Sequence, residues 1–107
     1  MPNDRILSLL GLAAKAGKAP SGGFAVEESV KSGKACLVVT AQDASAGSAK
    51  MFADLCRYYR IPCWSYADKE ALGHALGRGE RSAAAVTDEN LARAIRKLLE
   101  ERSDASV

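Results

Sequence analysis

The sequence predicts an α/β protein, a single-domain, three-layer α/β/α sandwich around a small sheet. Three observations lead to this fold class. Segments with helical spacing of apolar residues alternate with short apolar runs that are typical of buried strands. Such an alternation implies crossover connections, which place helices on both faces of a sheet. The 107 residues suffice for one hydrophobic core, and no linker, repeat or low-complexity tract divides the chain.

The first two helices are predicted from their apolar faces and their ends. Asn3 is the expected N-cap of the first helix, and Gly17 is expected to stop it. Val26 and Val30 mark the inner face of the second helix, which Gly33 ends. The apolar positions of the first helix are Ile6, Leu9, Leu10, Ala13 and Ala14.

Three strands are expected at residues 36–40, 63–66 and 82–86, with a third helix at 45–59 between the first two. The inner face of this helix is expected to hold Met51 or Phe52 together with Leu55, Cys56 and Tyr59. Four aromatic residues are expected to pack the helix against its strand: Tyr58, Tyr59, Trp64 and Tyr66.

The last two helices have aspartates at their expected starts. Asp68 can cap a fourth helix that carries Leu72 and Leu76 one turn apart, and Asp88 can cap a fifth. The fifth helix is expected to bury the stripe of Leu91, Ala94, Ile95, Leu98 and Leu99. The domain is therefore predicted to span residues 1–102, with a frayed tail at 103–107.

Two glycine-containing segments point to a ligand surface. Gly73 lies inside the fourth helix, where glycine costs about 1 kcal/mol relative to alanine, so we expect something to press against its backbone. Gly77 fits a left-handed helix cap that leads into a loop with Arg78 and Arg81. Upstream, residues 21–23 open the second helix with little side-chain bulk and free N–H groups. Together these segments predict a surface that binds a polyanion.

Composition narrows the class of protein further. With 48% apolar and 26% charged residues, the chain is an ordinary globular domain, and disorder over its whole length is excluded. A formal net charge of +2 permits nucleic-acid binding without demanding it. The first residues contain no long apolar run, so we expect neither a signal peptide nor a membrane span, and a cytoplasmic location.

The sequence offers little that an enzyme would need. Cys36, Cys56 and Cys63 are odd in number and form no Cys-x-x-Cys pair, so they are expected to be free, buried, structural thiols without a metal. His74 is the only histidine and is expected to be a surface side chain. Neither a Walker A sequence nor a dinucleotide fingerprint occurs. We therefore expect no catalytic residues and no cofactor.

The role of Phe24 and of the cations remains open at this stage. Phe24 lies in the first turn of the second helix, where it is either an edge-of-core residue or a platform for base stacking. Five cations either converge on one rim or are scattered over the surface: Lys15, Lys18, Lys34, Arg78 and Arg81.

Six short runs together resemble the kink-turn-binding ribosomal protein family: SGG at 21–23, KSGKA at 31–35, LVVTA at 37–41, DAS at 43–45, YYRIP at 58–62 and LGHALG at 72–77. More narrowly, the opening runs LLGLA at 9–13 and AGK at 16–18 resemble its bacterial YlxQ-like branch. The resemblance implies a mixed sheet between helix layers, with no cofactor and no catalytic step.

Members of this family bind RNA kink-turns, which are sharply bent duplexes, through the glycine-opened second helix and the loop before the last strand. Here those regions correspond to residues 22–28 and 77–83. The RNA-binding residues that this reasoning predicts are Lys18, Gly22, Gly23, Phe24, Lys34, Gly77, Arg78, Arg81 and Ser82. The implied partner of a monomeric chain is a structured RNA, such as a kink-turn or ribosomal RNA, and with it the ribosome.

The chain departs from the family pattern in the second helix. Where many kink-turn binders carry asparagine, glutamate and lysine, it has Phe24, Ala25 and Glu28, which cannot repeat the same hydrogen bonds to guanine edges. Two functions therefore stay open. The first is a non-enzymatic protein that recognises a kink-turn or related bent RNA. The second is a protein-interaction module of the same fold that has lost kink-turn binding. A nucleotide-binding enzyme has the least support.

Overall fold

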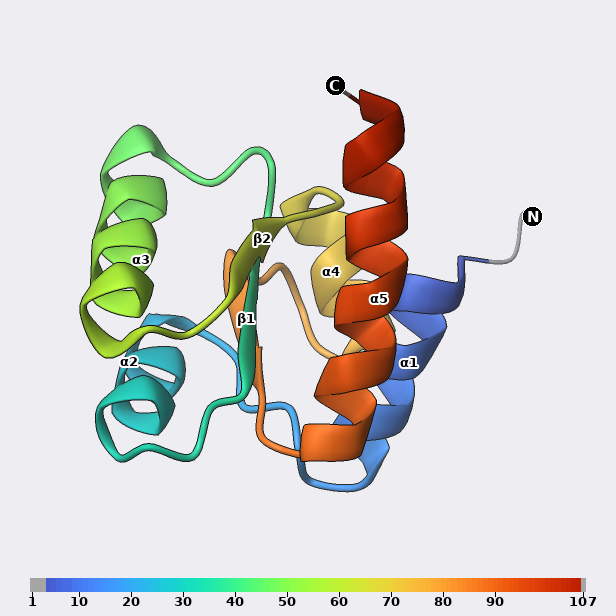
Figure 1. Ribbon diagram of the computed structural model, residues 1–107, viewed down its shortest axis with the longest axis horizontal. Coiled ribbons are helices and arrows are strands. Elements are labelled where there is room, and N and C mark those ends of the chain that lie inside the picture. The colour runs from blue at the N-terminus through green and yellow to red at the C-terminus, as the bar shows by residue number, and fades with distance from the viewer. Residues whose placement is uncertain (1–3, 107) are drawn as a thin grey trace.

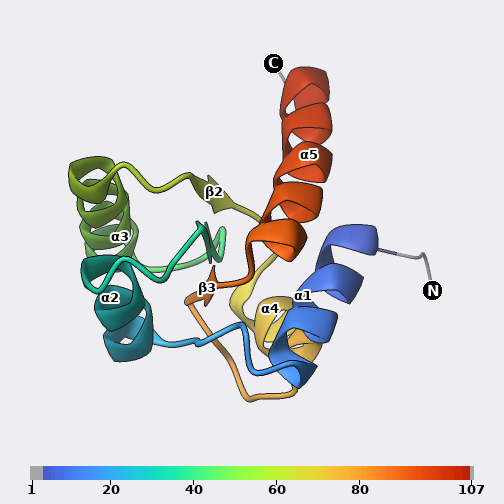
Figure 2. The same ribbon diagram turned by 60° about the horizontal axis from the view of Figure 1, so that its bottom comes forward.

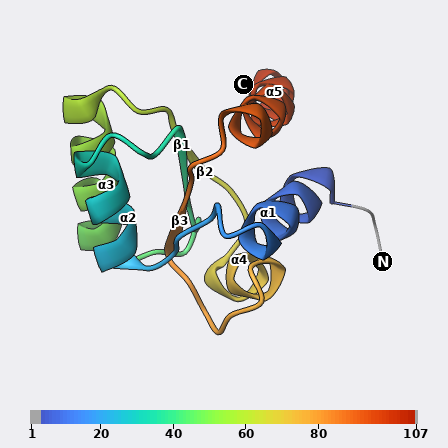
Figure 3. The ribbon, with the colours of Figure 1, turned by 90° about the horizontal axis from the view of Figure 1, so that it is seen from below.

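The computed structural model describes residues 4–106 and has the three expected layers (Figure 1). Helices α2 and α3 cover one face of the sheet, and α1, α4 and α5 cover the other (Figure 3). The elements in chain order are α1 (Arg5–Lys15), α2 (Gly23–Lys31), β1 (Leu37–Thr40), α3 (Ala46–Tyr59), β2 (Cys63–Ser65), α4 (Lys69–Ala75), β3 (Ala83–Val86) and α5 (Glu89–Ser106).

The sheet is small and mixed, in the order β2-β1-β3. The central strand β1 runs parallel to β2, where Val38 pairs with Cys63, and antiparallel to β3, where it pairs with Ala85. Every residue of β1 and β3 is buried, because helices cover both faces of these two strands. This double burial explains why both strands are nearly continuous apolar runs, and it confirms the predicted fold class.

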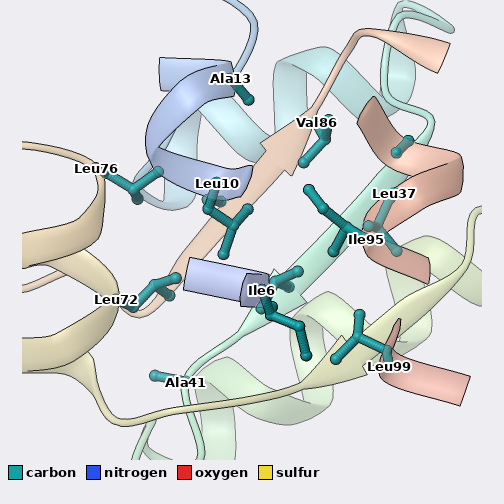
Figure 4. Packing of buried hydrophobic residues seen from close by; sticks show 13 residues of the cluster. Ile6, Leu10, Ala13, Leu37, Ala41, Leu72, Leu76, Val86, Ile95 and Leu99 are labelled. Atoms are coloured by element: carbon teal, nitrogen blue, oxygen red, sulfur yellow. The ribbon is translucent and has the colours of Figure 1, made fainter. Parts of the chain in front are cut away.

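Two hydrophobic clusters hold the layers together. The larger one lies between the sheet and the layer of α1, α4 and α5, and Figure 4 shows Ile6, Leu10 and Ile95 meeting Leu37 and Val86 there. The smaller cluster joins α2 and α3 to the opposite face of the sheet. Its members are Val26, Val30, Ala35, Val38, Phe52, Cys56, Ala83 and Ala85.

The starts of the helices follow the predicted capping, with one change. Asp68 and Asp88 cap α4 and α5 as expected, since each carboxylate accepts the backbone N–H of the residue three positions further along the chain. At α1, however, the cap is Asp4, whose Oδ1 accepts the N–H of Leu7 at 3.0 Å. The predicted cap, Asn3, lies outside the described residues.

The predicted helix faces need one correction. In α5, Ile95 and Leu99 are buried as expected and Ala92 is buried with them, whereas Ala94 is exposed because it lies outside the stripe that faces the sheet. In α3, of the two alternatives Met51 and Phe52, it is Phe52 that is buried, which agrees with the prediction. The helical backbone of α5 continues to Ser106.

The expected aromatic packing of α3 is wrong in most of its members. Tyr58 is 80% exposed and Tyr59 is 38% exposed, so both lie on the outer side of α3. Trp64 and Tyr66 pack instead against the larger cluster, on the other face of the sheet. Side chains alternate between the two faces along a strand, and Cys63 already faces α3.

Candidate nucleic-acid interface

The segment between α1 and α2 runs along the free edge of β3 and so fixes where α2 begins (Figure 2). The carbonyl of Lys18 accepts the N–H of Thr87 at 2.9 Å, and the carbonyl of Pro20 accepts the N–H of Ala85 at 2.8 Å. The N–H of Gly22 in turn donates to the carbonyl of Ala83 at 3.0 Å. These bonds, which the sequence reasoning missed by treating 18–20 as a link, place the start of α2 beside the loop that precedes β3.

The start of α2 differs from the other helix starts. Its N-cap residue is Gly22, at φ 93°, and no side chain caps it. Across residues 4–106, the other four helices each have a cap side chain that accepts a backbone N–H. The first-turn N–H groups and the positive end of the α2 dipole are therefore open to an anionic ligand.

The loop after α4 is held by close backbone contact. A Cβ atom on Gly73 would lie 1.9 Å from the carbonyl oxygen of Gly79, so only glycine lets the loop fold back onto the helix. Gly77 has φ 73° and turns the chain, and the N–H of Arg78 donates to the carbonyl of Gly73 at 2.8 Å. Both expectations for these glycines, a close contact at Gly73 and a left-handed residue at Gly77, are confirmed.

These two segments enclose a shallow groove of about 470 Å³, which we call the glycine groove. It is lined by Ser21, Gly22, Gly23, Phe24, Ala25, Glu80, Arg81 and Ser82. Arg81 joins its two sides, because its Nε donates to Ser21 Oγ at 3.1 Å and its guanidinium also donates to the carbonyl of Glu80. Five of the predicted site residues thus lie together, and Ser21, Ala25 and Glu80 are lining residues that were not among them.

Phe24 stands at the rim of the glycine groove with 81% of its surface exposed. The interpretation as an edge-of-core residue is therefore wrong. Its ring belongs to neither hydrophobic cluster of the described residues. We therefore expect Phe24 to contact a ligand or partner and not to stabilise the core.

The predicted cations divide between two places. Arg81 lies in the glycine groove, whereas Lys34 and Arg78 line a second hollow of about 390 Å³, here called the lysine hollow. The segment 17–22 connects the two, because Gly17 and Pro20 line the lysine hollow and Ser21 and Gly22 line the groove. Lys15 and Lys18 are exposed at the same end of this segment. Gly77 lines neither hollow and acts only in the turn.

Groups that could support catalysis are not gathered at either hollow. His74 is exposed on α4, as expected. Cys36, Cys56 and Cys63 are free thiols, although only Cys56 is fully buried and the other two are half-buried, which corrects the expectation for them. A hydrogen bond with Cys63, together with burial, raises the pKa of the Cys56 thiol and keeps it protonated.

Two further observations concern the described part of the chain. Within it, no group of three or more His, Cys, Asp or Glu side chains is arranged to hold a metal ion. None of its helices combines the length and the apolar character required to cross a membrane.

The fold and the groove define a class of protein, a small α/β/α sandwich whose uncapped, glycine-opened helix start faces a basic loop. The chain belongs to the ribosomal protein L7Ae/L30e/S12e/Gadd45 family, which it matches over residues 4–96. This assignment confirms the resemblance that the short sequence runs carry.

Two relatives share the name RNA-binding protein YlxQ. The one from Bacillus subtilis (strain 168) is 37% identical over 92 residues, which cover 86% of this chain and 92% of the relative. The one from Enterococcus faecium is 28% identical over 97 residues, covering 91% and 93% of the two chains. This chain is thus YlxQ-like over most of its length.

Two solved structures have the same fold. A protein of unknown function from Bacillus halodurans superimposes with a TM-score of 0.88 at 34% identity, over 92% of this chain and 99% of the other. The 15.5kD RNA binding protein of Giardia lamblia superimposes with a TM-score of 0.79 at 22% identity, over 94% and 92% of the two chains. At that identity the second likeness concerns the fold alone.

Proposed function

We propose that this chain is a non-enzymatic RNA-binding protein that recognises a kink-turn or a related bent RNA in the glycine groove. The observation that carries the proposal is the uncapped start of α2, held beside the arginine-bearing loop by the pairing of residues 18–22 with β3. The proposal agrees with the family of the chain and with the name of its YlxQ relatives.

The physical support is strongest for contacts with phosphates. A sharp bend brings phosphates of an RNA close together, and a helix N-terminus offers N–H donors and a partial positive charge to such a site. Gly22 and Gly23 carry no side chain that would keep a phosphate from this backbone. Arg81 adds a full charge in the groove, and Lys34 and Arg78 continue the cationic track into the lysine hollow.

Within the glycine groove, the same geometry favours recognition of shape over recognition of base edges. Phe24 and Ala25 cannot form the hydrogen bonds to guanine edges that asparagine and glutamate form in many kink-turn binders. Backbone N–H groups and cations respond to the positions of phosphates, and these positions report the bend itself. We therefore expect affinity to depend on the bend and on salt concentration.

The proposal also covers the kind of RNA, the oligomeric state, the cellular location and the side chains that contact the RNA. The RNA is proposed to be structured, with ribosomal RNA as the leading candidate and association with the ribosome as its consequence. The protein is proposed to act as a monomer in the cytoplasm, with Lys18, Lys34, Arg78, Arg81 and Ser82 as its side-chain contacts to the RNA.

A second candidate function is a protein-interaction module that keeps the fold but does not bind kink-turns. The exposure of Phe24 favours it, because exposed aromatic residues are also frequent anchors of protein interfaces. Glu28 favours it too, since its carboxylate would repel a phosphate at a position where many kink-turn binders carry lysine.

The two functions differ in their response to a bent RNA. The test is to measure the dissociation constant for a kink-turn RNA and for a straight duplex of the same composition, over a series of salt concentrations. We expect the kink-turn to bind at least about tenfold more tightly, with an affinity that falls steadily as salt rises. Equal affinity for both RNAs contradicts bend recognition, and no binding to either favours the interaction module.

A further inference from the structure

We infer that the outer face of α2 carries a pocket for one unpaired guanine of the bound RNA. In this inference Phe24 is the stacking platform and Glu28 accepts the hydrogen bonds of the base. The inference rests on the proposed function, because it requires that an RNA already occupies the glycine groove.

A third hollow adjoins the glycine groove on the outer side of α2. It has a volume of about 450 Å³ and is lined by Phe24, Glu27, Glu28, Lys31 and Ser32. Phe24 belongs to both hollows, so its ring lies on the boundary between them. Phe24 and Glu28 are four residues apart in α2, which places their side chains on one face of the helix, about 5–6 Å apart at their Cβ atoms.

The two glutamates of this hollow are not equivalent. Glu27 is paired with Lys31, whose Nζ lies 2.8 Å from the carboxylate. Glu28 is exposed and makes neither a hydrogen bond nor an ion pair with any residue that the structure describes. Its carboxylate is therefore a free acceptor with two oxygens, beside an exposed aromatic ring.

A free carboxylate at this position excludes one kind of contact and favours another. It repels the phosphates of an RNA backbone, so it does not replace the lysine of other kink-turn binders. It can, however, accept hydrogen bonds from the edge of a base whose donors point outward, while the base stacks on the neighbouring ring. The residues that depart from the family pattern thus form one coherent site.

Guanine fits this carboxylate better than the other three bases. Its Watson–Crick edge presents N1–H and N2–H side by side, which matches the two oxygens of a carboxylate. Adenine and cytosine each place a ring acceptor beside their amino group, and uracil places its single N–H between two carbonyls. These acceptors would face the carboxylate and repel it.

A nucleotide is favoured over a protein partner because the hollow continues the glycine groove. An RNA chain that crosses the start of α2 needs only one unpaired base to reach over Phe24, and a bend in RNA exposes unpaired bases for such contacts. A guanine also supplies two N–H donors for the two carboxylate oxygens of Glu28, which an apolar side chain of a protein partner packed on Phe24 does not.

The test uses the full chain and a kink-turn RNA in which each unpaired nucleotide of the bend is changed in turn to G, A, C, U or inosine. At one position we expect guanine to bind at least about tenfold more tightly than adenine, with inosine intermediate because it lacks the N2 amino group. Glu28→Gln should abolish this preference. Phe24→Ala should weaken binding of the preferred RNA by roughly 5- to 150-fold through lost stacking.

The chain offers matched controls for both substitutions. Tyr58 is 80% exposed, nearly as much as Phe24, and lies on α3, so Tyr58→Ala should leave affinity unchanged. Glu70 is an exposed glutamate at the start of α4, and Glu70→Gln should leave the preference for guanine unchanged.

The outcomes separate this inference from the function on which it rests. If the kink-turn still binds more tightly than the straight duplex, but its affinity does not depend on the identity of any unpaired base, the guanine pocket is wrong and the proposed function stands. The same conclusion follows if guanine is preferred over adenine and Glu28→Gln leaves that preference unchanged. If the kink-turn is not preferred at all, the proposed function fails and the pocket fails with it. A Phe24→Ala protein with unchanged affinity for the preferred RNA also overturns the pocket.

Discussion

Two glycine-rich segments build the glycine groove, and they contain glycine for opposite reasons. At Gly73 the space that a side chain would need is filled by the backbone of Gly79, with a distance of 1.9 Å from a Cβ position to the carbonyl oxygen. At Gly22 nothing lies within 4 Å of a Cβ position, and at Gly23 only an atom of the Phe52 ring is reached, at 4.0 Å. One segment is closed by the protein itself, and the other is left open.

The difference shows which part of the groove is scaffold and which part is ligand surface. The loop after α4 derives its shape from contacts within the protein, so changes at Gly73 should act on stability. The start of α2 has free N–H groups and little around it, so changes there should act on binding. We expect the largest effect at Gly73, smaller effects at the start of α2 and in the arginine-bearing loop, and the smallest at Tyr66, outside both segments.

Replacing Gly73 with alanine should produce the largest loss of stability. The new Cβ would overlap the Gly79 carbonyl, and backbone cannot yield as a flexible side chain can. We expect the free energy of unfolding in urea to fall by about 3 kcal/mol or more. Gly47→Ala is the matched control, because Gly47 lies in α3 with open space around it and should be neutral or slightly stabilising. A Gly73→Ala protein as stable as this control would contradict the close contact.

Replacing Gly23 with leucine should strongly weaken RNA binding while leaving the fold intact. Gly23 has no positive φ, and a first side-chain atom would make only ordinary contact with Phe52, so the helix can accept a side chain. The remaining atoms of leucine would reduce the room for a ligand in the groove. We expect affinity for a kink-turn RNA to fall about a hundredfold, or about 2.7 kcal/mol, with little change in Tm. Unchanged affinity would place the RNA elsewhere and favour the interaction module.

Replacing both Arg78 and Arg81 with alanine should weaken binding moderately and change its salt dependence. Each arginine that contacts a phosphate contributes about one unit to the slope of log affinity against log salt, so the slope should fall by about two. We expect the loss of affinity near physiological salt to be about tenfold. The single variants sharpen the test, because Arg81 also donates to Ser21 whereas Arg78 lines the lysine hollow. An unchanged slope would remove both arginines from the site.

The smallest effect is expected at Tyr66, which lines neither the glycine groove nor the lysine hollow. Its hydroxyl donates to Asp4 Oδ2 at 2.6 Å, and burial together with this bond raises the pKa of Tyr66 to about 12. The raised pKa means that this stabilisation is complete below pH 10 and is lost as the pH rises through 12. Tyr66→Phe should lower the free energy of unfolding by about 1 kcal/mol at neutral pH and leave RNA affinity unchanged.

The pH dependence provides an internal check on that last prediction. The difference in stability between the parent protein and Tyr66→Phe should shrink as the pH rises from 10 to 12, because the ionised tyrosine no longer donates to Asp4. A difference that stays constant over this range would mean that packing, and not the hydrogen bond, accounts for the effect.

The sequence by itself determined the order of the elements, the fold class and the family. The reason is that these depend on local signals: the period of apolar residues, the aspartate caps at Asp68 and Asp88, and the glycines that end helices. The close contact at Gly73 was also predictable, because a glycine inside a helix lowers stability and is expected there only where another group occupies the space of a side chain. Each of these signals involves only a few neighbouring residues, so it can be recognised in the sequence without knowledge of the fold.

The tertiary structure alone decided which residues share a surface. No local pattern shows that residues 18–22 pair with β3, that Arg81 reaches Ser21 across 60 positions, or that Arg78 faces a different hollow. The same holds for Phe24 and for Trp64, whose surroundings depend on which face of the sheet each element covers. Long-range pairing and the choice of face are set by packing between distant segments, and packing is a property of the folded chain as a whole.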